Sequence, residues 1–500
     1  MKKSLLSLSA ATLALSTFLL ANPATTSAAP KADLSSISLS WSKTLNDPNL
    51  PIAESSPTLA HLPDPSVVVG DRAGNVYAYN IASGNTVPGW PVRLGATNPI
   101  DSPLSATKLS PTASADTVYV GVGTDGTPST PIGYLAINAN GTTRWSHTAL
   151  DTEPAGQNVH GVIAGITLVP TGSSQMAVAG STGQVMHAFG ANRGAESWSF
   201  LTADSVHSAA AYAPTGKNGT TEVILGGDST SSHGIPIGNP PFVYQDGGHL
   251  RFFSLTGQKR CEIPQPNQTL DSSPAVGPIL PKGKLGVVIG TGSYYPGASD
   301  TGKLIIANRS CQIVSRLSVG GVTYASPALA KLDGTHTAII EIASKGSSSP
   351  GKLVAFDTSG AMLPGYPKST TAAVVGPASP VTADLFNTGN QDIIVPTLAG
   401  LDIFDGPTGS LIGVLANYHA FQSTPMVTFD QSSQTLSITA AGYTASTQCP
   451  TNQSICLRGT IDHFIAHEAT SLPTSPDQSW PMFHHDSTLS GSQLAPLTQS

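Results

Sequence analysis

Two histidines and one aspartate are the residues whose types and spacing could hold a metal ion. Asp101, His160 and His207 each stand just before the start of a repeating unit that is described below. Two imidazoles and one carboxylate can form a facial metal site that leaves coordination positions open for substrate. The shared position predicts a transition-metal site if the three side chains face one another. The competing interpretation is a polar lining whose side chains hydrogen-bond to water.

The chain contains four cysteines, and their spacing predicts two disulfides. They are Cys261, Cys311, Cys449 and Cys456. Cys449 and Cys456 enclose a short segment, whereas Cys261 and Cys311 fall at similar places in two consecutive repeats. An even number of cysteines in an exported chain is typical of disulfides, so we expect Cys261–Cys311 and Cys449–Cys456. A zinc site is the alternative, but the sequence lacks a CxxC pair.

Two segments between the expected strands are rich in aromatic residues. Residues 231–248 include Phe242 and Tyr244, and residues 293–300 include Tyr294 and Tyr295. Long loops on a rigid scaffold often carry binding sites. The two segments therefore predict an aromatic ligand-binding surface, with a purely decorative role as the alternative.

Other motifs with chemical potential are weak. The segment DLFNTGNQD (384–392) keeps Asp384 and Asp392 of a calcium-binding loop but has Phe386 and Thr388 at positions that need oxygen ligands. A turn in which the aspartates accept backbone N–H groups is the competing interpretation. No G-x-S-x-G motif precedes a helix, and the sequence offers no catalytic cysteine.

The elements that must position these residues are short strands in a repeating order. Eight units start near Ser56, Ser102, His160, His207, Ser273, Ser326, Ser379 and Thr424. Each unit has a start step that usually contains Pro, then β-branched apolar runs separated by Gly turns, and often a Trp or Tyr at its end. Spacings of about 45 to 65 residues are within reach of the period of four-stranded propeller blades. The sequence therefore predicts an all-β, eight-bladed β-propeller in which the residues before each start step lie near the axis.

The eighth unit lacks a last strand, and the N-terminal part of the chain supplies a candidate. The segment SLSWSKTL (38–45) resembles TTRWSHTAL (142–150), with Trp41 matching Trp145. We expect this N-terminal strand to complete the last blade and to protect the ring from opening.

The repeat unit S-P-x-L…VVVG…G-x-(V/L)-x-A-(Y/F)-(N/D)…G…W resembles the quinoprotein-like eight-bladed propeller family. That family includes quinone-dependent alcohol dehydrogenases and the lipoprotein scaffold of outer-membrane protein assembly. The resemblance covers roughly residues 38 to 467. The segments 325–343 and 378–395 also resemble FG-GAP-type repeats, and the tail WPMFHHDSTLSG (480–491) resembles the closing segment of exported propeller proteins. Such motifs specify a fold far better than a function.

The resemblance implies a pyrroloquinoline quinone (PQQ) site with a vicinal Cys pair, a Trp floor, calcium and an Asp base. No two cysteines are adjacent here, and Trp41, Trp90, Trp145 and Trp198 lie on expected outer strands, where they would wedge blades together. We therefore expect no PQQ and no other resident cofactor, with calcium or a transition metal as the alternative.

Composition and charge restrict the class of partner. The formal net charge is −7 and no basic stripe is present, which argues against nucleic acid. Lys2-Lys3, the apolar stretch 5–21 and Thr26-Ser27-Ala28 have the features of a signal peptide cleaved near Ala28. The apolar stretch is too short for a good membrane span. We expect a signal peptide (1–28), a propeller (29–470) and a tail (471–500) that packs on it or is partly disordered.

These observations favour a secreted or periplasmic bacterial protein without catalytic activity. The expected function is binding of a protein or glycan ligand through loops on one face of a monomeric propeller. A metal- or quinone-dependent oxidoreductase, or an enzyme acting on polysaccharide, is the alternative and would need a site at the central channel. A structural component of the cell envelope is the third hypothesis.

Overall fold

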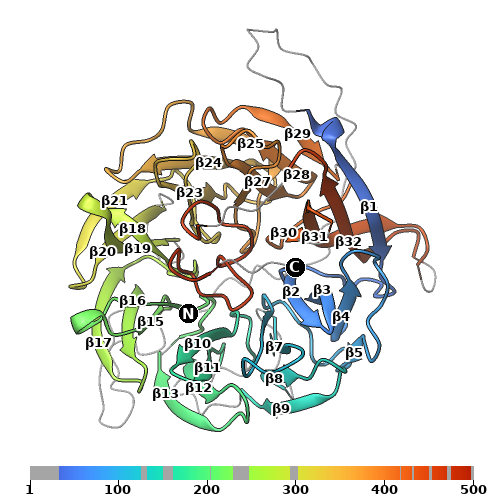
Figure 1. Ribbon diagram of the computed structural model, residues 1–500, viewed down its shortest axis with the longest axis horizontal. Coiled ribbons are helices and arrows are strands. Elements are labelled where there is room, and N and C mark those ends of the chain that lie inside the picture. Colours follow the sequence, from blue (N-terminus) through green and yellow to red (C-terminus); the bar gives the residue numbers. More distant parts are fainter. Residues whose placement is uncertain are drawn as a thin grey trace.

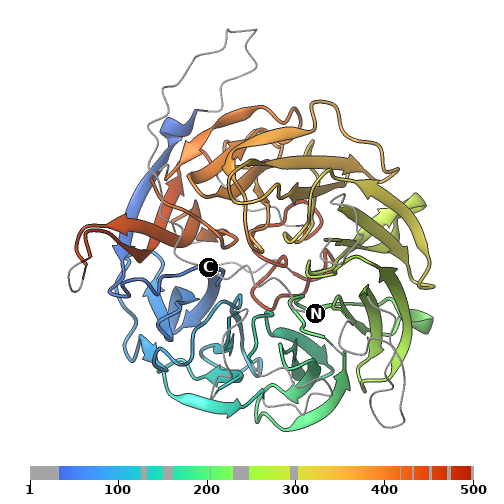
Figure 2. The same cartoon turned by 180° about the vertical axis from the view of Figure 1, so that it is seen from behind.

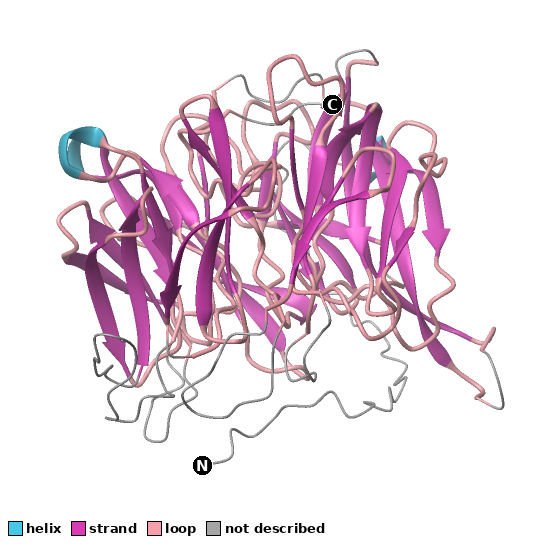
Figure 3. Cartoon of the chain, turned by 90° about the horizontal axis from the view of Figure 1, so that it is seen from below, coloured by secondary structure: helices cyan, strands magenta, loops and turns pink. Residues whose placement is uncertain are grey.

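The chain forms an all-β, eight-bladed propeller, which confirms the predicted fold class (Figure 1). The computed structural model describes residues 33–124, 132–149, 161–202, 204–228, 247–292, 302–416, 418–430, 433–449, 453–469 and 475–496. Eight four-stranded antiparallel sheets surround one axis, and the same ring is seen from behind in Figure 2. In the side view of Figure 3 the strands run between the two faces of the ring.

Each blade contributes strands in chain order from the axis outward, except the eighth. Blade one is β2 (Thr58–Leu62), β3 (Asp64–Gly70), β4 (Asn75–Asn80) and β5 (Val92–Arg93); blade two is β6 (Ser105–Thr107), β7 (Thr117–Gly121), β8 (Tyr134–Ile137) and β9 (Thr143–His147); blade three is β10 (Thr167–Thr171), β11 (Ser174–Gly180), β12 (Val185–Gly190) and β13 (Glu196–Leu201); blade four is β14 (Ala211–Ala213), β15 (Glu222–Leu225), β16 (Gly247–Ser254) and β17 (Lys259–Pro266). Blade five is β18 (Ala275–Leu280), β19 (Lys284–Gly290), β20 (Lys303–Asn308) and β21 (Ile313–Ser318); blade six is β22 (Ala328–Ala330), β23 (Ala338–Ala343), β24 (Pro350–Asp357) and β25 (Lys368–Ala373); blade seven is β26 (Val381–Ala383), β27 (Asp392–Thr397), β28 (Gly400–Phe404) and β29 (Leu411–Leu415); blade eight is β30 (Met426–Asp430), β31 (Thr435–Ser446), β32 (Cys456–Ala466) and β1 (Ile37–Thr44). Short 3₁₀ turns, η1 (Leu34–Ser36), η2 (Lys217–Gly219) and η3 (Pro281–Gly283), complete the described elements.

The N-terminal strand β1 closes the ring, as the sequence predicted. It pairs antiparallel with β32, and Trp41 lies opposite His463. The last blade is therefore built from both ends of the described chain, which leaves no blade with a missing outer strand.

Continuous apolar runs form the middle strands because each blade is covered on both faces. Val67, Val68 and Val69 of β3 are fully buried. Val68 packs in a cluster with Val120 of blade two, whereas Val67 and Val69 pack with Ile461 of blade eight. Successive residues of a strand point to opposite faces, so the run VVV serves two interfaces at once. Within the part of the chain that the structure describes, no helix has the length and apolar character needed to cross a bilayer.

A tryptophan on an outer strand fastens each of several blades to the next one. The Trp145 indole N–H donates to Ala191 O at 2.8 Å, and its ring covers Gly194. Gly194 has φ +68, and a Cβ at this position would lie 2.7 Å from the indole. The same bond joins Trp41 to Ile81 and Trp198 to Leu255. It also joins Trp90 to Ala139, although Trp90 lies in the segment before β5 and not on the outer strand that the sequence predicted. These contacts explain why a turn Gly and a Trp recur in the repeat.

A disulfide takes the place of this Trp–Gly contact between blades four and five. Cys261, on the outer strand β17, pairs with Phe252 of β16. Trp198 holds the same place in blade three, since on the outer strand β13 it pairs with Ala188 of β12. Cys311 occupies the turn after β20 with φ 57, and it bonds to Cys261. The predicted pairing is correct, but the two cysteines do not hold similar places in their repeats. One lies on an outer strand and the other lies in the turn that this strand faces.

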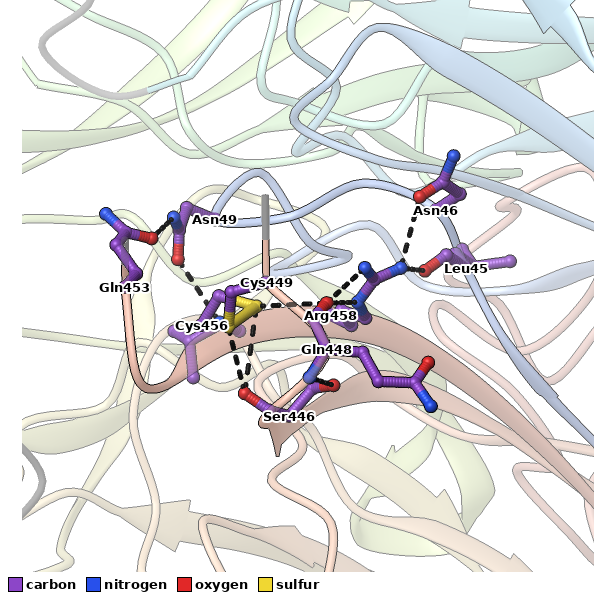
Figure 4. The surroundings of a disulfide bond; sticks show 10 residues. Leu45, Asn46, Asn49, Ser446, Gln448, Cys449, Gln453, Cys456 and Arg458 are labelled. Atoms are coloured by element: carbon purple, nitrogen blue, oxygen red, sulfur yellow. Dashed lines mark hydrogen bonds between the residues drawn. A yellow bond between two sulfur atoms is a disulfide. The ribbon is translucent and has the colours of Figure 1, made fainter. Parts of the chain in front are cut away.

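The second disulfide lies near the end of the long β31–β32 hairpin. Cys449 and Cys456 are bonded, as predicted, and Arg458 links the hairpin to the segment before blade one (Figure 4). Its guanidinium donates to Leu45 O at 3.3 Å and to Asn46 Oδ1 at 3.1 Å. These contacts hold the hairpin against the start of the chain where it extends beyond β30.

The C-terminal segment 478–493, which we name the tail circuit, passes once around the axis (Figure 1). Its carbonyl groups accept N–H bonds of 2.7–3.0 Å from seven blades in turn. In order, Gln478, Trp480, Pro481, Ser487, Thr488, Ser490 and Gly491 accept from Lys331, Thr382, Val427, Ala106, Leu168, Tyr212 and Val276. Met482 packs in the same apolar cluster as Leu59 of blade one, and Gln493 Nε2 returns to blade six at Leu329 O. One end of the axis is therefore filled by the chain itself.

Hydroxyl groups of the start steps form a second set of links between blades. The Oγ of each Ser or Thr accepts the backbone N–H of the equivalent residue in the preceding blade, at 2.8–3.0 Å. The donor and acceptor pairs are Ala209–Ser273, Ser273–Ser326, Ser326–Ser379, Ser379–Thr424 and Thr424–Ser56. The last bond closes the ring from blade eight to blade one. This chain explains why Ser or Thr precedes Pro in blades one, five, six, seven and eight.

Candidate functional site

Six polar residues form a ring around the axis at the end away from the tail circuit. First strands of neighbouring blades contact one another at seven of the eight blade boundaries, so equivalent residues before these strands encircle the axis. Four positions before the first strand stand Glu54, Asp101, Ile163, His207, Asp271, Tyr324, Pro377 and Gln422. We name the six polar members the polar ring. The residues of the polar ring precede the start-step hydroxyls in the chain. The tail circuit bonds to residues that follow these hydroxyls, so the polar ring and the tail circuit lie toward opposite ends of the axis.

In blades two and four, the structure shifts by one residue the alignment of the repeats that the sequence predicted. The sequence grouped Asp101 and His207 with Ser55. However, Gly70 N donates to Ser55 Oγ at 3.0 Å, and Gly121 N donates to Ser102 Oγ at 3.0 Å, so Ser102 is the counterpart of Ser55. Asp101 and His207 therefore align with Asp271. The shift arises because Pro103 stands one position earlier, relative to its strand, than the Pro of blade one.

Arg72 gives the polar ring its fixed charge. It lies in the turn between β3 and β4, and its Nε and Nη2 donate to both oxygens of Asp101 at 2.8 Å. Glu54 lies 3.8 Å from Nη2. The Asp101 side chain is 2% exposed, whereas Arg72 and Glu54 are 25% and 27% exposed. Burial lowers the Arg72 pKa, but the charges of Asp101 and Glu54 outweigh it and hold the pKa above its usual value.

Two tyrosines complete this end of the axis. Gln422 Nε2 donates to the Tyr443 hydroxyl at 2.8 Å, and Tyr443 is close enough to Arg72 for their charges to interact. Burial raises the Tyr443 pKa, although Gln422 and Arg72 oppose the shift. Burial and the charge of Asp271 raise the Tyr324 pKa. Both hydroxyls are therefore neutral at physiological pH and able to donate a hydrogen bond.

The predicted metal site is assembled only in part by the described residues. Asp101 is in the ring but is engaged by Arg72, His207 is in the ring two blades away, and His160 lies outside the described residues. Across the residues that the structure describes, no three His, Cys, Asp or Glu side chains gather closely enough to hold an ion. The metal site thus stays a prediction. In the 384–392 loop, Asp384 accepts from Thr388 N and Gly389 N, as the turn interpretation expected.

The aromatic loop residues Phe242, Tyr244, Tyr294 and Tyr295 lie outside the described residues. The described strands on either side of them, β15 and β16 in blade four and β19 and β20 in blade five, end and begin at the same end of the ring as the polar ring, because alternate strands reverse direction. The binding surface they predict stays a prediction.

Sequence reasoning missed Arg72, Glu54 and Tyr443. Arg72 occupies a Gly-turn segment that looks like any other blade turn, and Tyr443 belongs to a hairpin whose length the sequence did not reveal. One signal was available for Glu54, since it stands one residue before Ser55 as Asp271 stands before Ser272. A carboxylate recurring at one repeat position would have pointed to the ring.

Comparisons with known proteins give the fold and nothing more specific. No protein-family model and no curated protein sequence match the chain. Among solved structures, a europium-containing methanol dehydrogenase has a TM-score of 0.59 and 10% identity, covering 86% of this chain and 93% of that one. Quinohemoprotein alcohol dehydrogenases from Comamonas testosteroni (TM-score 0.56) and Pseudomonas putida HK5 (0.57) are 13% identical, covering 88% of this chain and 78% of theirs. These likenesses support the quinoprotein-like propeller fold, and the FG-GAP-like detail stays a prediction.

The residues described here do not fit the quinone site that such a fold implies. The four cysteines are consumed in disulfides whose partners are 50 and 7 residues apart, so no vicinal pair exists. Four tryptophans donate their indole N–H between blades, and Trp480 is buried in the tail circuit against His485. None of them is left to form a cofactor floor at the polar ring, so we derive no step through a quinone.

Proposed function

We propose that this protein is an exported propeller that binds a protein or glycan ligand at the polar ring, without catalysing a reaction. The tail circuit carries this proposal, because it fills one end of the axis, while among the described residues the polar ring stands at the other end with partly exposed side chains. Arg72 is held in one orientation by two bonds to Asp101, which is the preorganisation that binding sites use. Two disulfides support a location outside the cytoplasm.

An array of oligosaccharides and peptides tests this function with two matched double variants. The ring variant combines His207→Ala and Asp271→Asn; among the described residues neither side chain makes a hydrogen bond, so both changes should leave the fold intact. The control combines Lys108→Ala and Lys217→Ala, which are exposed in turns at the tail-circuit end. Ligands should bind the wild type and the control but lose at least tenfold in affinity for the ring variant.

Binding that the ring variant leaves unchanged would refute the proposed site. A fold check by circular dichroism on all three proteins removes misfolding as an explanation. Turnover of any bound ligand by the wild type would contradict the non-catalytic role.

A further inference from the structure

The polar ring leaves both donors and acceptors unused. Arg72 commits Nε and Nη2 to Asp101, while its Nη1 has no partner among the described residues. The Tyr443 oxygen accepts from Gln422, so its own proton is free to be donated. Asp271 and His207 offer acceptor atoms that no described residue occupies. A ligand that satisfies this set must both accept and donate hydrogen bonds, at groups that belong to different blades.

The charge of the ring selects against an anionic ligand. Glu54, Asp101 and Asp271 are three carboxylates and Arg72 is one guanidinium, so these four groups carry two excess negative charges. The positive charge of Arg72 is already compensated by Asp101 at 2.8 Å. A phosphate, sulfate or uronate would therefore meet net repulsion.

A simple cation would match the charge but not the donors. It would lie beside the Arg72 guanidinium and would leave the Tyr443 hydroxyl proton without an acceptor. Hydroxyl groups are both donors and acceptors, so they satisfy Arg72, Tyr443 and the carboxylates together. Tyr324 and Tyr443 are both partly exposed and add aromatic surface on which an apolar sugar face can pack.

We propose that the polar ring binds the hydroxyl groups of a neutral saccharide, an inference that rests on the proposed function and narrows it to one ligand class. In this arrangement Arg72 and Tyr443 donate to sugar oxygens, and Asp271 accepts from sugar hydroxyls. Asp101 acts through Arg72 by fixing its orientation. The site recognises a pattern of hydroxyls and not a charge.

Calorimetric titration with defined probes tests the ligand class. The probes are neutral hexasaccharides of glucose, galactose, mannose and N-acetylglucosamine, together with hexagalacturonate and hexalysine. At least one neutral hexasaccharide should bind, and its dissociation constant should change less than twofold between low and high salt, because no net ligand charge is screened. Arg72→Lys, which keeps the charge but loses the planar donor edge, should weaken binding at least tenfold.

The outcomes separate the two proposals. Salt-sensitive binding of hexalysine alone, lost in Asp271→Asn, would keep the polar ring as the binding site but overturn the saccharide. Binding of no neutral hexasaccharide, or binding that Arg72→Lys, Asp271→Asn and the Lys108/Lys217 control affect equally, would also overturn the saccharide. If no probe of any class distinguishes the ring variants from the control, both proposals fail.

Discussion

At the scale of single residues, the Trp145 indole illustrates how each blade is held to the next. Its N–H meets Ala191 O while its ring lies on Gly194, whose left-handed backbone brings the turn close enough for contact. A side chain at Gly194 would therefore meet two separate penalties, one from the backbone and one from the indole. Gly172 carries only the first, because a Cβ there would meet nothing within 4 Å.

Gly194→Ala should destabilise the protein more than Gly172→Ala. Both glycines have positive φ, +68 and +76, but a Cβ at Gly172 meets nothing within 4 Å. We expect a cost of about 1 kcal/mol for Gly172→Ala from the backbone alone and about 1–3 kcal/mol more for Gly194→Ala from overpacking. Urea unfolding of the two variants measures the difference, and equal losses would show that the indole contact is not tight.

Asp392 should make the protein less stable as the pH rises. Burial raises the pKa of Asp392 to about 8, although Leu385 N donates to its carboxylate. Because the folded pKa lies above the unfolded value of about 4, the stabilising contribution is full below about pH 4 and is lost as the pH rises through 8. Asp392→Asn keeps the acceptor for Leu385 and removes the titration.

The variant should therefore gain stability relative to the wild type between pH 5 and pH 8, by about 1.4 kcal/mol for each pH unit. Urea unfolding of both proteins across this range gives the difference and cancels the other titrating groups. A difference that does not change with pH would contradict a protonated Asp392.

At the scale of elements, the blade boundary is the unit in which sequence and structure agree best. Middle strands were predictable because runs such as Val67–Val69 must be apolar on both faces. The role of the tryptophans between blades was predictable because a Trp recurs near the end of several repeats, where the outer strand must pack against the next blade. The position of Asp101 relative to the other blades was not predictable. A Ser-Pro step that stands one residue further from its strand looks the same in the sequence, and only the bond between Ser102 and Gly121 reveals the difference.

The disulfide between blades four and five should be replaceable by the contact used elsewhere. Cys261→Ala with Cys311→Ala should cost about 2–5 kcal/mol, the usual loss for a native disulfide. Cys261→Trp with Cys311→Gly should recover much of this, because Trp and Gly occupy the same two positions between blades three and four.

Thermal unfolding with and without dithiothreitol compares the three proteins. The wild type should lose stability on reduction, whereas the Trp–Gly variant should lose only what the Cys449–Cys456 disulfide contributes. If the Trp–Gly variant is no more stable than the double alanine variant, the two kinds of contact are not equivalent.

At the scale of the whole molecule, the path of the tail circuit around the axis is what sequence reasoning could not supply, although a tail that packs on the propeller was one of the two expectations for residues 471–500. The segment WPMFHHDSTLSG shows no strand pattern, and its partners come from all around the ring, so no local signal reports them. The polar ring was predictable in part, since the sequence placed Asp101 and His207 near the axis, but its other members were not grouped with these two because they are separated by whole blades. The ring closure at β1 was predictable because Trp41 repeats a local motif.

A chain that ends at residue 474 should be much less stable than one that ends at residue 496. The shorter chain loses the buried side chains of Trp480, Met482 and Phe483 together with the hydrogen bonds to seven blades. Burial of one large aromatic side chain alone contributes about 3–5 kcal/mol. Limited proteolysis and thermal unfolding measure the effect, and equal stability of the two chains would show that the tail circuit is dispensable.

Arrays of repeats normally behave as one-dimensional systems in which each unit interacts only with its neighbours, so they can unravel from one end. The tail circuit changes that connectivity, because one short segment touches every blade. Loss of any one blade detaches part of a segment on which the other seven also depend. The consequence is cooperativity: eight similar units are joined into a single thermodynamic unit, which melts in one transition and has no stable state with a blade missing.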